Sequence, residues 1–380
     1  LRSTVEQDSE PVIRTEGMRK TFQQEGHQVR AVDDVSLVLR RGETLGLVGE
    51  SGTGKTTLAR ALLGLTAADQ GSVIELDGKM LPTRIDKRDD NQVRALQIVF
   101  QNPDSALNRR FSVHRILSRA LEKLRRDKSD EREIHLRELA QSVRFDVRLI
   151  NSRPAQLSGG LKQRVAIARA FAGEPQVVVC DEPTSALDVS VQAAILNLLS
   201  ELQLRSKTSY LLISHDLGVV RYLADRIAVM YLGRIMEVGD SETVFRGPNH
   251  PYTEALLSAV PNIDSEVRAR ILLEGEIPSP ANPPTGCVFN TRCHRAIAGL
   301  CEVTEPPLVE VEPGHQMACH IPVEELRILQ RRRTTEGAGD VEAAVAKAAE
   351  TTGQSVDELA ESVQEAESDV APTSPDGNPS

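Results

Sequence analysis

The chain of 380 residues contains no tryptophan and only 11 other aromatic residues, and it lacks a long apolar run. No stretch approaches the ~20 apolar residues that a membrane-spanning helix needs. The first residues, Leu1–Ser9, are polar and contain no signal-peptide core. These absences argue against an integral membrane protein and against a secreted one. The length instead predicts one full domain with a smaller one, because domains usually contain about 100–200 residues.

The net charge of −10 comes from the C-terminal end of the chain. Residues 334–380 contain 11 acidic side chains and one basic side chain, whereas residues 1–333 carry 44 of each sign. This tail has no aromatic residue and too little apolar surface to offset the entropy lost on ordering, so we expect it to be disordered. We expect the same of residues 1–11. The balanced remainder shows no basic patch typical of nucleic-acid binding.

Apolar runs alternate with helical periodicity over residues 12–258, which predicts an α/β layer. A mainly helical segment, about 102–172, interrupts the strands and predicts a helical subdomain. The short run Val177–Cys180 is continuously apolar, as expected of a strand buried on both faces. Strands are predicted at 31–39, 43–48, 95–100, 177–180 and 210–214, and helices at 57–64, 112–147 and 161–172.

A glycine-rich segment, Gly49–Thr56 (GESGTGKT), follows a predicted strand, precedes a predicted helix and matches G-x-x-x-x-G-K-[ST]. Glycine lets backbone N–H groups converge on phosphate oxygens, and the helix N-terminus adds further donors. Lys55 is expected to reach the β- and γ-phosphates, and the Thr56 hydroxyl to coordinate Mg²⁺. The predicted ATP-binding set from this segment is Gly49, Glu50, Ser51, Gly52, Thr53, Gly54, Lys55, Thr56 and Thr57.

An apolar strand that ends in Asp181 and Glu182 supplies the complementary half of this site. The strand would place both carboxylates at the carboxyl edge of the sheet, beside the glycine-rich loop. Asp181 is predicted to hold Mg²⁺, directly or through water, and Glu182 to polarise the attacking water. Without the loop, an acidic residue that merely ends a buried strand would be the simpler interpretation.

Between these halves lies Leu157–Arg164 (LSGGLKQR), which resembles the signature of the ATP-binding-cassette (ABC) ATPases. N–H groups at the start of the following helix can cap a phosphate, although a Gly-Gly helix start alone would be structural. The resemblance implies a P-loop NTPase cassette with a RecA-like core, an antiparallel β subdomain and a helical subdomain. It also implies that Ser158, Gly159, Gly160 and Gln163 act on ATP held mainly by a second ABC ATPase subunit, this chain or a paralogue.

The same resemblance implies roles for four further residues. Gln101 matches the glutamine that senses Mg²⁺ and the attacking water and contacts the membrane subunit. Asp188 matches a loop that crosses the dimer interface, and His215 the histidine that contacts the γ-phosphate. Phe22 matches the aromatic residue that stacks on adenine. The catalytic set is then Glu182, His215 and Gln101, and the Mg²⁺ set is Thr56, Gln101 and Asp181.

Longer segments, some of which extend beyond these motifs, resemble the ATPases of oligopeptide and dipeptide importers. They include Ala31–Ser36, Gly42–Gly52, Ser185–Asn197, His250–Leu257 and Gly286–His320. The resemblance implies ATP-driven peptide uptake at the cytoplasmic face of the membrane, as a peripheral subunit on two permease subunits served indirectly by an extracytoplasmic solute-binding protein. A nickel or other small-solute importer, a soluble phosphonate-lyase-type ATPase and a scaffolding module remain alternatives.

This chain departs from the importer pattern at three places. Cysteine is common where Thr53 stands, Leu161 and Lys162 differ within the signature, and Arg109–Arg110 replace a common proline. None of these changes removes a catalytic group.

Four of the five cysteines lie in an extension at 259–333, spaced C-x5-C-x7-C-x17-C. Without a secretion signal, a metal or cluster site fits better than disulfides. Four thiolates suit a [4Fe–4S] cluster or Zn²⁺, and the resemblance favours the cluster because some relatives carry one there. His294, His315 and His320 are alternative ligands, and free thiols remain open. The predicted ligands are Cys287, Cys293, Cys301 and Cys319.

Overall fold

A computed structural model of the chain describes residues 10–24, 26–259 and 271–331. The acidic tail and most of the N-terminal segment, both expected to be disordered, lie outside the described residues. Strand β1 begins at Pro11, within the expected N-terminal segment. Among the described residues, no helix combines the length and apolarity needed to cross a bilayer.

The main sheet has eight strands in the order β11-β12-β10-β9-β3-β8-β7-β6. Its central strands are parallel, and β10, β12 and β11 continue it in antiparallel fashion. The strands are β3 (Thr44–Val48), β6 (Leu96–Val99), β7 (Val177–Asp181), β8 (Ser209–Ile213), β9 (Arg226–Tyr231), β10 (Arg234–Asp240), β11 (Val309–Glu312) and β12 (His315–Met317).

Strands β3, β7 and β8 are buried at every residue, as their continuous apolar sequences predict. Residues that follow neighbouring parallel strands meet at one sheet edge. The loop after β3 therefore lies on the same edge as Asp181 at the end of β7 and His215 after β8.

A second, antiparallel sheet of four strands has the order β2-β1-β4-β5. The predicted strand at 31–39 belongs to this sheet, as part of β2, and pairs along its length with β1, which the sequence reading did not identify. The antiparallel β subdomain implied by the family resemblance is thus confirmed. Its strands are β1 (Pro11–Gln24), β2 (His27–Arg40), β4 (Val73–Leu76) and β5 (Lys79–Met80).

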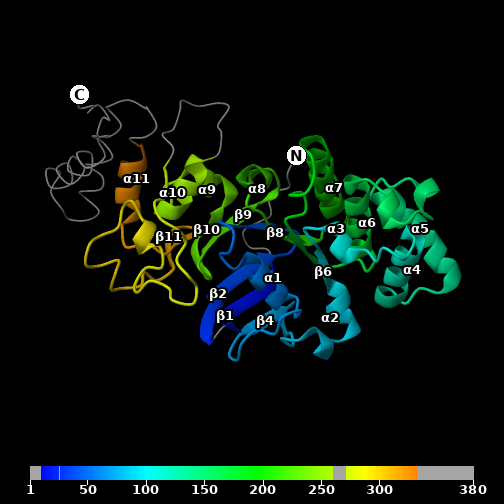
Figure 1. Ribbon diagram of the computed structural model, residues 1–380, viewed down its shortest axis with the longest axis horizontal. Coiled ribbons are helices and arrows are strands. Elements are labelled where there is room, and N and C mark those ends of the chain that lie inside the picture. The colour runs from blue at the N-terminus through cyan, green and yellow to red at the C-terminus, as the bar shows by residue number, and fades with distance from the viewer. Residues whose placement is uncertain (1–9, 25, 260–270, 332–380) are drawn as a thin grey trace, which may run out of the picture.

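Helices α3 to α6 gather at one end of the molecule and form the expected helical subdomain (Figure 1). The predicted helical stretch 112–147 is in fact two helices, because Arg126 adopts a positive φ of 61° between them. The helices are α1 (Lys55–Leu62), α2 (Asp90–Ala95), α3 (Pro103–Ala106), α4 (Val113–Leu124), α5 (Ser129–Ser142), α6 (Gly159–Phe171), α7 (Val189–Ser206), α8 (Leu217–Leu223), α9 (Ser241–Arg246), α10 (Pro251–Ser258) and α11 (Val323–Arg331).

The C-terminal extension lies at the opposite end of the molecule and joins the main sheet (Figure 1). Strand β12 pairs with β10 through Glu237 and Val238. A single turn of 3₁₀ helix, Asn290–Arg292, lies within the cysteine-bearing segment, and Phe289 just before it is fully buried against Tyr231 and Tyr252. The extension and the cassette therefore share one sheet and one apolar cluster.

Candidate nucleotide-binding and hydrolysis site

The glycine-rich loop connects β3 to α1, as predicted, and two of its glycines cannot be replaced without movement of the backbone. Gly49 has φ 148° and Gly54 has φ 106°. A Cβ atom would lie 2.2 Å from the Met230 carbonyl oxygen at Gly49 and 2.1 Å from the Ala31 carbonyl oxygen at Gly54. Both positions thus require glycine for conformation and for space.

Lys55 is buried and turns back onto its own loop. Its Nζ donates hydrogen bonds of 2.7 Å to the carbonyl oxygens of both Gly49 and Glu50. Burial lowers the pKa of Lys55, while the carboxylates of Glu182 and Asp181 raise it and offset part of that effect. The ammonium group therefore lies where the loop and the acidic strand end meet. Around it, Ser51 and Gly52 are exposed, Thr53 is buried, and Thr57 is half-buried on α1.

Thr56 and Asp181 have the donor chemistry that Mg²⁺ prefers. The Thr56 hydroxyl donates to Asp181 Oδ1 at 3.2 Å, and burial raises the pKa of Asp181. A hydroxyl and a carboxylate oxygen brought together at a phosphate loop fit a Mg²⁺ ion, which would neutralise charge on the β- and γ-phosphates. Gln101, the third predicted ligand, donates from its amide Nε2 to Glu182 Oε2, and its amide oxygen is the atom that could bind a metal ion.

Glu182 is held from two sides. Gln101 Nε2 donates to Glu182 Oε2 at 2.9 Å, and His215 Nδ1 lies 3.0 Å from Oε1. The backbone of Glu182 adopts φ 46°, a conformation uncommon for a non-glycine residue. Gln101, Glu182 and His215 thus form one cluster, although each follows a different predicted strand. The cluster fixes the Glu182 carboxylate next to Lys55.

The signature segment forms a separate, exposed helix start. Ser158 caps α6 by accepting a hydrogen bond from the Leu161 N–H, and both Ser158 and Gly159 are exposed. A Cβ at Gly160 would lie 2.6 Å from Val191 Cγ1, so this glycine also allows α6 to approach α7. Gln163 differs from the other predicted signature residues because it is only 1 % exposed, beneath that surface.

Asp188 and Phe22 lie at the surface. Asp188 caps α7 by accepting a hydrogen bond from the Val191 N–H, and this bond lowers the pKa of Asp188. Phe22, on β1, is 39 % exposed, and Lys20 Nζ lies 5.2 Å from its ring centroid. Among the described residues, no hydrogen bond joins Ser158 or Asp188 to the Lys55 loop, so one chain supplies the two parts of the site at separate places.

Asp104 is a residue that the sequence analysis missed. It lies on α3, just after Gln101, and accepts ion pairs of 3.2 Å each from Lys162 on α6 and from Arg109. Lys162 and Arg109 are two of the places where this chain departs from the importer pattern. Because both cations pair with Asp104, the segment that follows Gln101 is joined to the signature helix α6. The two unusual basic residues, Lys162 and Arg109, were the sequence signal that could have indicated Asp104.

The four clustered cysteines are all free thiols. Burial, with a contribution from neighbouring thiols, raises the pKa of Cys293 and of Cys319 to about 12. Among the described residues, no group of three or more histidine, cysteine or acidic side chains is placed to hold a metal ion. This arrangement does not fit a preformed [4Fe–4S] or Zn²⁺ centre, so no chemistry is assigned to one. Iron, sulfide and zinc analysis after anaerobic purification is the measurement that decides the prediction.

The histidines of the extension are engaged elsewhere. His294 lies 3.3 Å from Glu254, His315 pairs with buried Glu237 at 2.7 Å, and His320 contacts the Thr304 carbonyl oxygen. Each therefore has a local partner that accounts for its position.

Comparison with known proteins agrees with this geometry. Two family descriptions match the chain: "ABC transporter" over residues 32–185 and "Oligopeptide/dipeptide transporter, C-terminal region" over residues 236–301. A putative peptide import ATP-binding protein of Brucella ovis is 45% identical over 310 residues, which are 81% of this chain and 97% of that protein. The oligopeptide transport ATP-binding protein OppF of Haemophilus influenzae is 44% identical over 77% of this chain and 88% of its own length.

Solved structures show the same fold at lower identity. The cassette MJ0796, determined as a dimer in a post-hydrolysis state with ADP and Pi, has a TM-score of 0.53 at 26% identity and covers 60% of this chain and 98% of its own. CbiO1 of Clostridium perfringens, part of the ABC transporter complex cbiONQ, has a TM-score of 0.56 at 26% identity and covers 63% of this chain and 92% of its own.

A phosphate loop and an acidic strand end on the parallel part of one sheet, together with a capped signature helix in a helical subdomain, define an ABC-type P-loop ATPase, whose reaction is ATP hydrolysis. The sequence alone led to the same class. The chain belongs to the ATP-binding proteins of the oligopeptide/dipeptide ABC transporter family.

Proposed function

We propose that this chain hydrolyses ATP to power peptide uptake, as a peripheral subunit on the cytoplasmic face of a membrane permease. Relatives named for peptide import cover most of the chain, and the importer-type C-terminal region is present. The structural observation that carries the proposal is an open groove between the core and the helical subdomain.

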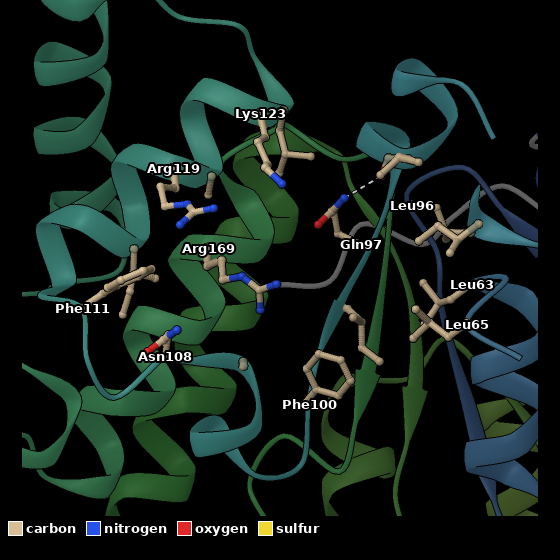
Figure 2. A pocket seen from close by; sticks show the side chains of 17 residues that line it. Leu63, Leu65, Leu96, Gln97, Phe100, Asn108, Phe111, Arg119, Lys123 and Arg169 are labelled. Carbon is tan, nitrogen blue, oxygen red and sulfur yellow. Dashed lines mark hydrogen bonds between the residues drawn. The ribbon is translucent and has the colours of Figure 1, made fainter. Parts of the chain in front are cut away.

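The groove has a volume of about 400 Å³, and its walls are mostly apolar. Phe100, which directly precedes Gln101, lies on one wall with Leu65, and Phe111 lies on the other (Figure 2). Leu65 is 47 % exposed and Ile85 is 38 % exposed. Apolar side chains left open beside a catalytic residue are typical of a surface that a partner covers.

Three cations, Arg119, Lys123 and Arg169, project into the same groove from α4 and α6 (Figure 2). Burial lowers the pKa of Arg169, and among the described residues none of the three forms an ion pair with a carboxylate. Apolar walls with cations along one side fit an amphipathic helix that carries acidic side chains. We assign this groove to such a helix of the permease. A shift of that helix against Phe100 would move Gln101, the next residue, and with it the hydrogen bond that Gln101 donates to Glu182.

Membrane association tests this docking. The double variant Arg119→Glu, Lys123→Glu should leave the membrane fraction of the native host and should keep its basal ATPase activity. Arg148→Glu is the matched control, because Arg148 lies in the same subdomain, is 90 % exposed and lies outside the groove. Full retention of the double variant on membranes, or equal release of the control, would contradict the docking.

The catalytic cycle requires two cassettes in this proposal. The exposed Ser158 helix start of one subunit would cover the γ-phosphate held by Lys55 of the other. Support comes from Val189, which is 83 % exposed next to Asp188 although valine favours burial. Within each site, Phe22 would stack on adenine, the loop N–H groups and Lys55 would hold the phosphates, and Thr56 with Asp181 would hold Mg²⁺. Glu182, aligned by Gln101 and His215, accepts a proton from the attacking water.

Solute uptake separates peptide import from the alternatives. Cells that lack this chain should lose uptake of a labelled dipeptide or oligopeptide and should regain it with the wild-type chain. Loss of nickel uptake instead would indicate a metal importer. A chain recovered only in the soluble fraction, with both uptakes unchanged, would indicate a soluble ABC ATPase.

A further inference from the structure

The C-terminal extension contacts the phosphate loop directly, at Glu50. Arg292 Nη1 lies 2.7 Å from Glu50 Oε2, and Arg292 Nη2 lies 3.1 Å from Oε1, which makes a bidentate pair across 242 residues of sequence. A planar guanidinium with two parallel bonds fixes both the position and the orientation of a carboxylate. The side chain of Arg292 is 6 % exposed and that of Glu50 is 28 % exposed, so the pair is partly shielded from water.

A second contact from the same side fixes the backbone of Glu50. The Glu50 N–H donates to the Tyr252 hydroxyl at 2.8 Å. Tyr252 is fully buried, and its ring packs against Tyr231 and Phe289 with centroid distances of 4.8 and 5.2 Å. Arg292 itself lies over the Tyr231 ring, 5.9 Å from its centroid. The Tyr252 hydroxyl and the Arg292 guanidinium, which both bind Glu50, are therefore held in place by the same aromatic cluster.

The negative charge of Glu50 means that its contacts with Arg292 and Tyr252 affect ATP binding. Glu50 is close enough to Lys55 to raise the pKa of that ammonium group. A carboxylate so close to the phosphate-binding lysine would also repel a triphosphate bound there, unless another charge neutralises it. Arg292 is the cation in contact with it, and the pairing raises the pKa of Arg292.

We infer that Arg292 is a positioning residue for ATP binding: it neutralises Glu50 and holds it away from the phosphates, so that the extension sets the nucleotide affinity of the cassette. This role deepens the proposed function, since it rests on ATP binding at the Lys55 loop. It makes the C-terminal region part of the nucleotide site, although no residue of that region lies in the phosphate loop itself.

Nucleotide titration of the full-length chain tests the inference. Arg292→Ala should weaken ATP binding about tenfold, because a charge-assisted pair is lost and Glu50 is left uncompensated. Adding Glu50→Gln to Arg292→Ala should restore most of the affinity, since the repelling charge is then gone. Arg292→Lys, which keeps the charge but not the fork, should fall between wild type and Arg292→Ala.

Arg295→Ala is the matched control. Arg295 lies three residues away and makes an equally bidentate pair, 3.0 and 3.1 Å, with Glu254 on α10, away from the loop. It should bind ATP within about twofold of wild type. Thermal unfolding of each variant identifies those that have lost their fold, and Arg292→Lys serves in place of Arg292→Ala if the latter unfolds.

Three results would overturn the inference: unchanged affinity in folded Arg292→Ala, failure of Glu50→Gln to restore it, or an equal loss in Arg295→Ala. The last two would mean that Arg292 acts only by stabilising the extension. A wild-type chain that binds no ATP would instead contradict the proposed function, so the two failures are distinct.

Discussion

Replacement of Glu182 by glutamine removes basicity while preserving the local hydrogen bonds. The oxygen of the new amide can still accept from Gln101 Nε2, which lies 2.9 Å from the carboxylate in the wild-type chain. The amide nitrogen lies where it can donate to His215 Nδ1, 3.0 Å from the carboxylate, once the imidazole carries its proton on Nε2. The substitution is isosteric, so the geometry of the cluster is retained. The principal change is that the side chain no longer accepts a proton from the attacking water.

The size of the effect follows from that single loss. A positioned general base usually contributes about 10²–10⁴ in rate, which corresponds to about 2.7–5.4 kcal/mol of barrier. ATP affinity should be retained or should rise slightly, because one negative charge near the phosphates disappears. The predicted result is therefore a large fall in turnover with no fall in binding, and the ATP-bound pair of cassettes should accumulate.

Steady-state phosphate release gives the turnover, nucleotide titration gives the affinity, and size-exclusion chromatography with ATP detects the pair. Glu174→Gln is a suitable control, since Glu174 is 63 % exposed and pairs with Arg125 and Arg94 at the surface. Turnover of Glu182→Gln near that of wild type would refute the assignment of Glu182. If Ser158→Arg in the Glu182→Gln background still paired normally with ATP, the two-cassette site would be wrong.

Three further predictions concern the loop and the buried histidine. Lys55→Ala should weaken ATP binding about 10–100-fold in a nucleotide titration, because two charge-assisted phosphate contacts are lost. Gly54→Ala should reduce ATP affinity without unfolding the chain, since a Cβ 2.1 Å from the Ala31 carbonyl oxygen distorts the loop at a cost of about 1–3 kcal/mol; wild-type affinity would contradict this. Burial lowers the pKa of His250 to about 3. The unfolded chain thus takes up a proton near pH 6.5 that the folded chain does not, and stability falls as the pH drops from 6.5 towards 3. Between pH 7.5 and 5 the loss is about 2 kcal/mol, and denaturant unfolding of His250→Asn should show a correspondingly smaller slope with pH.

Features that depend on local sequence were predictable. The phosphate loop, the strand before Asp181 and the helix start at Ser158 each have their signal within about ten residues, and the structure has all three where they were expected. The helical character of 112–147 was predicted, but the break at Arg126 that divides it into α4 and α5 was not, because no proline or glycine marks it in the sequence. Strand β1 was missed since it alternates irregularly and its register with β2 shifts at several bulges.

Features that depend on contacts between distant residues were not predictable from one sequence. The hydrogen bonds that align Glu182 join residues 81 and 33 positions apart, and only the shared sheet edge brought them together. Asp104 has no motif of its own, and its importance appears only when Lys162 and Arg109 are seen to meet it. The ion pair between Arg292 and Glu50 likewise joins residues 242 positions apart, and no sequence pattern relates their two segments.

The pairing of β12 with β10 has a practical consequence for anyone who wishes to work with a shorter protein. A version cut after α10 would leave the backbone donors and acceptors of β10 open along one side, ready to recruit the same strand of another molecule. It would also remove His315 from the buried Glu237, which would then keep only its hydrogen bonds from Asn249 and from the His250 N–H. Biochemistry on such a fragment would report on aggregation rather than on the cassette.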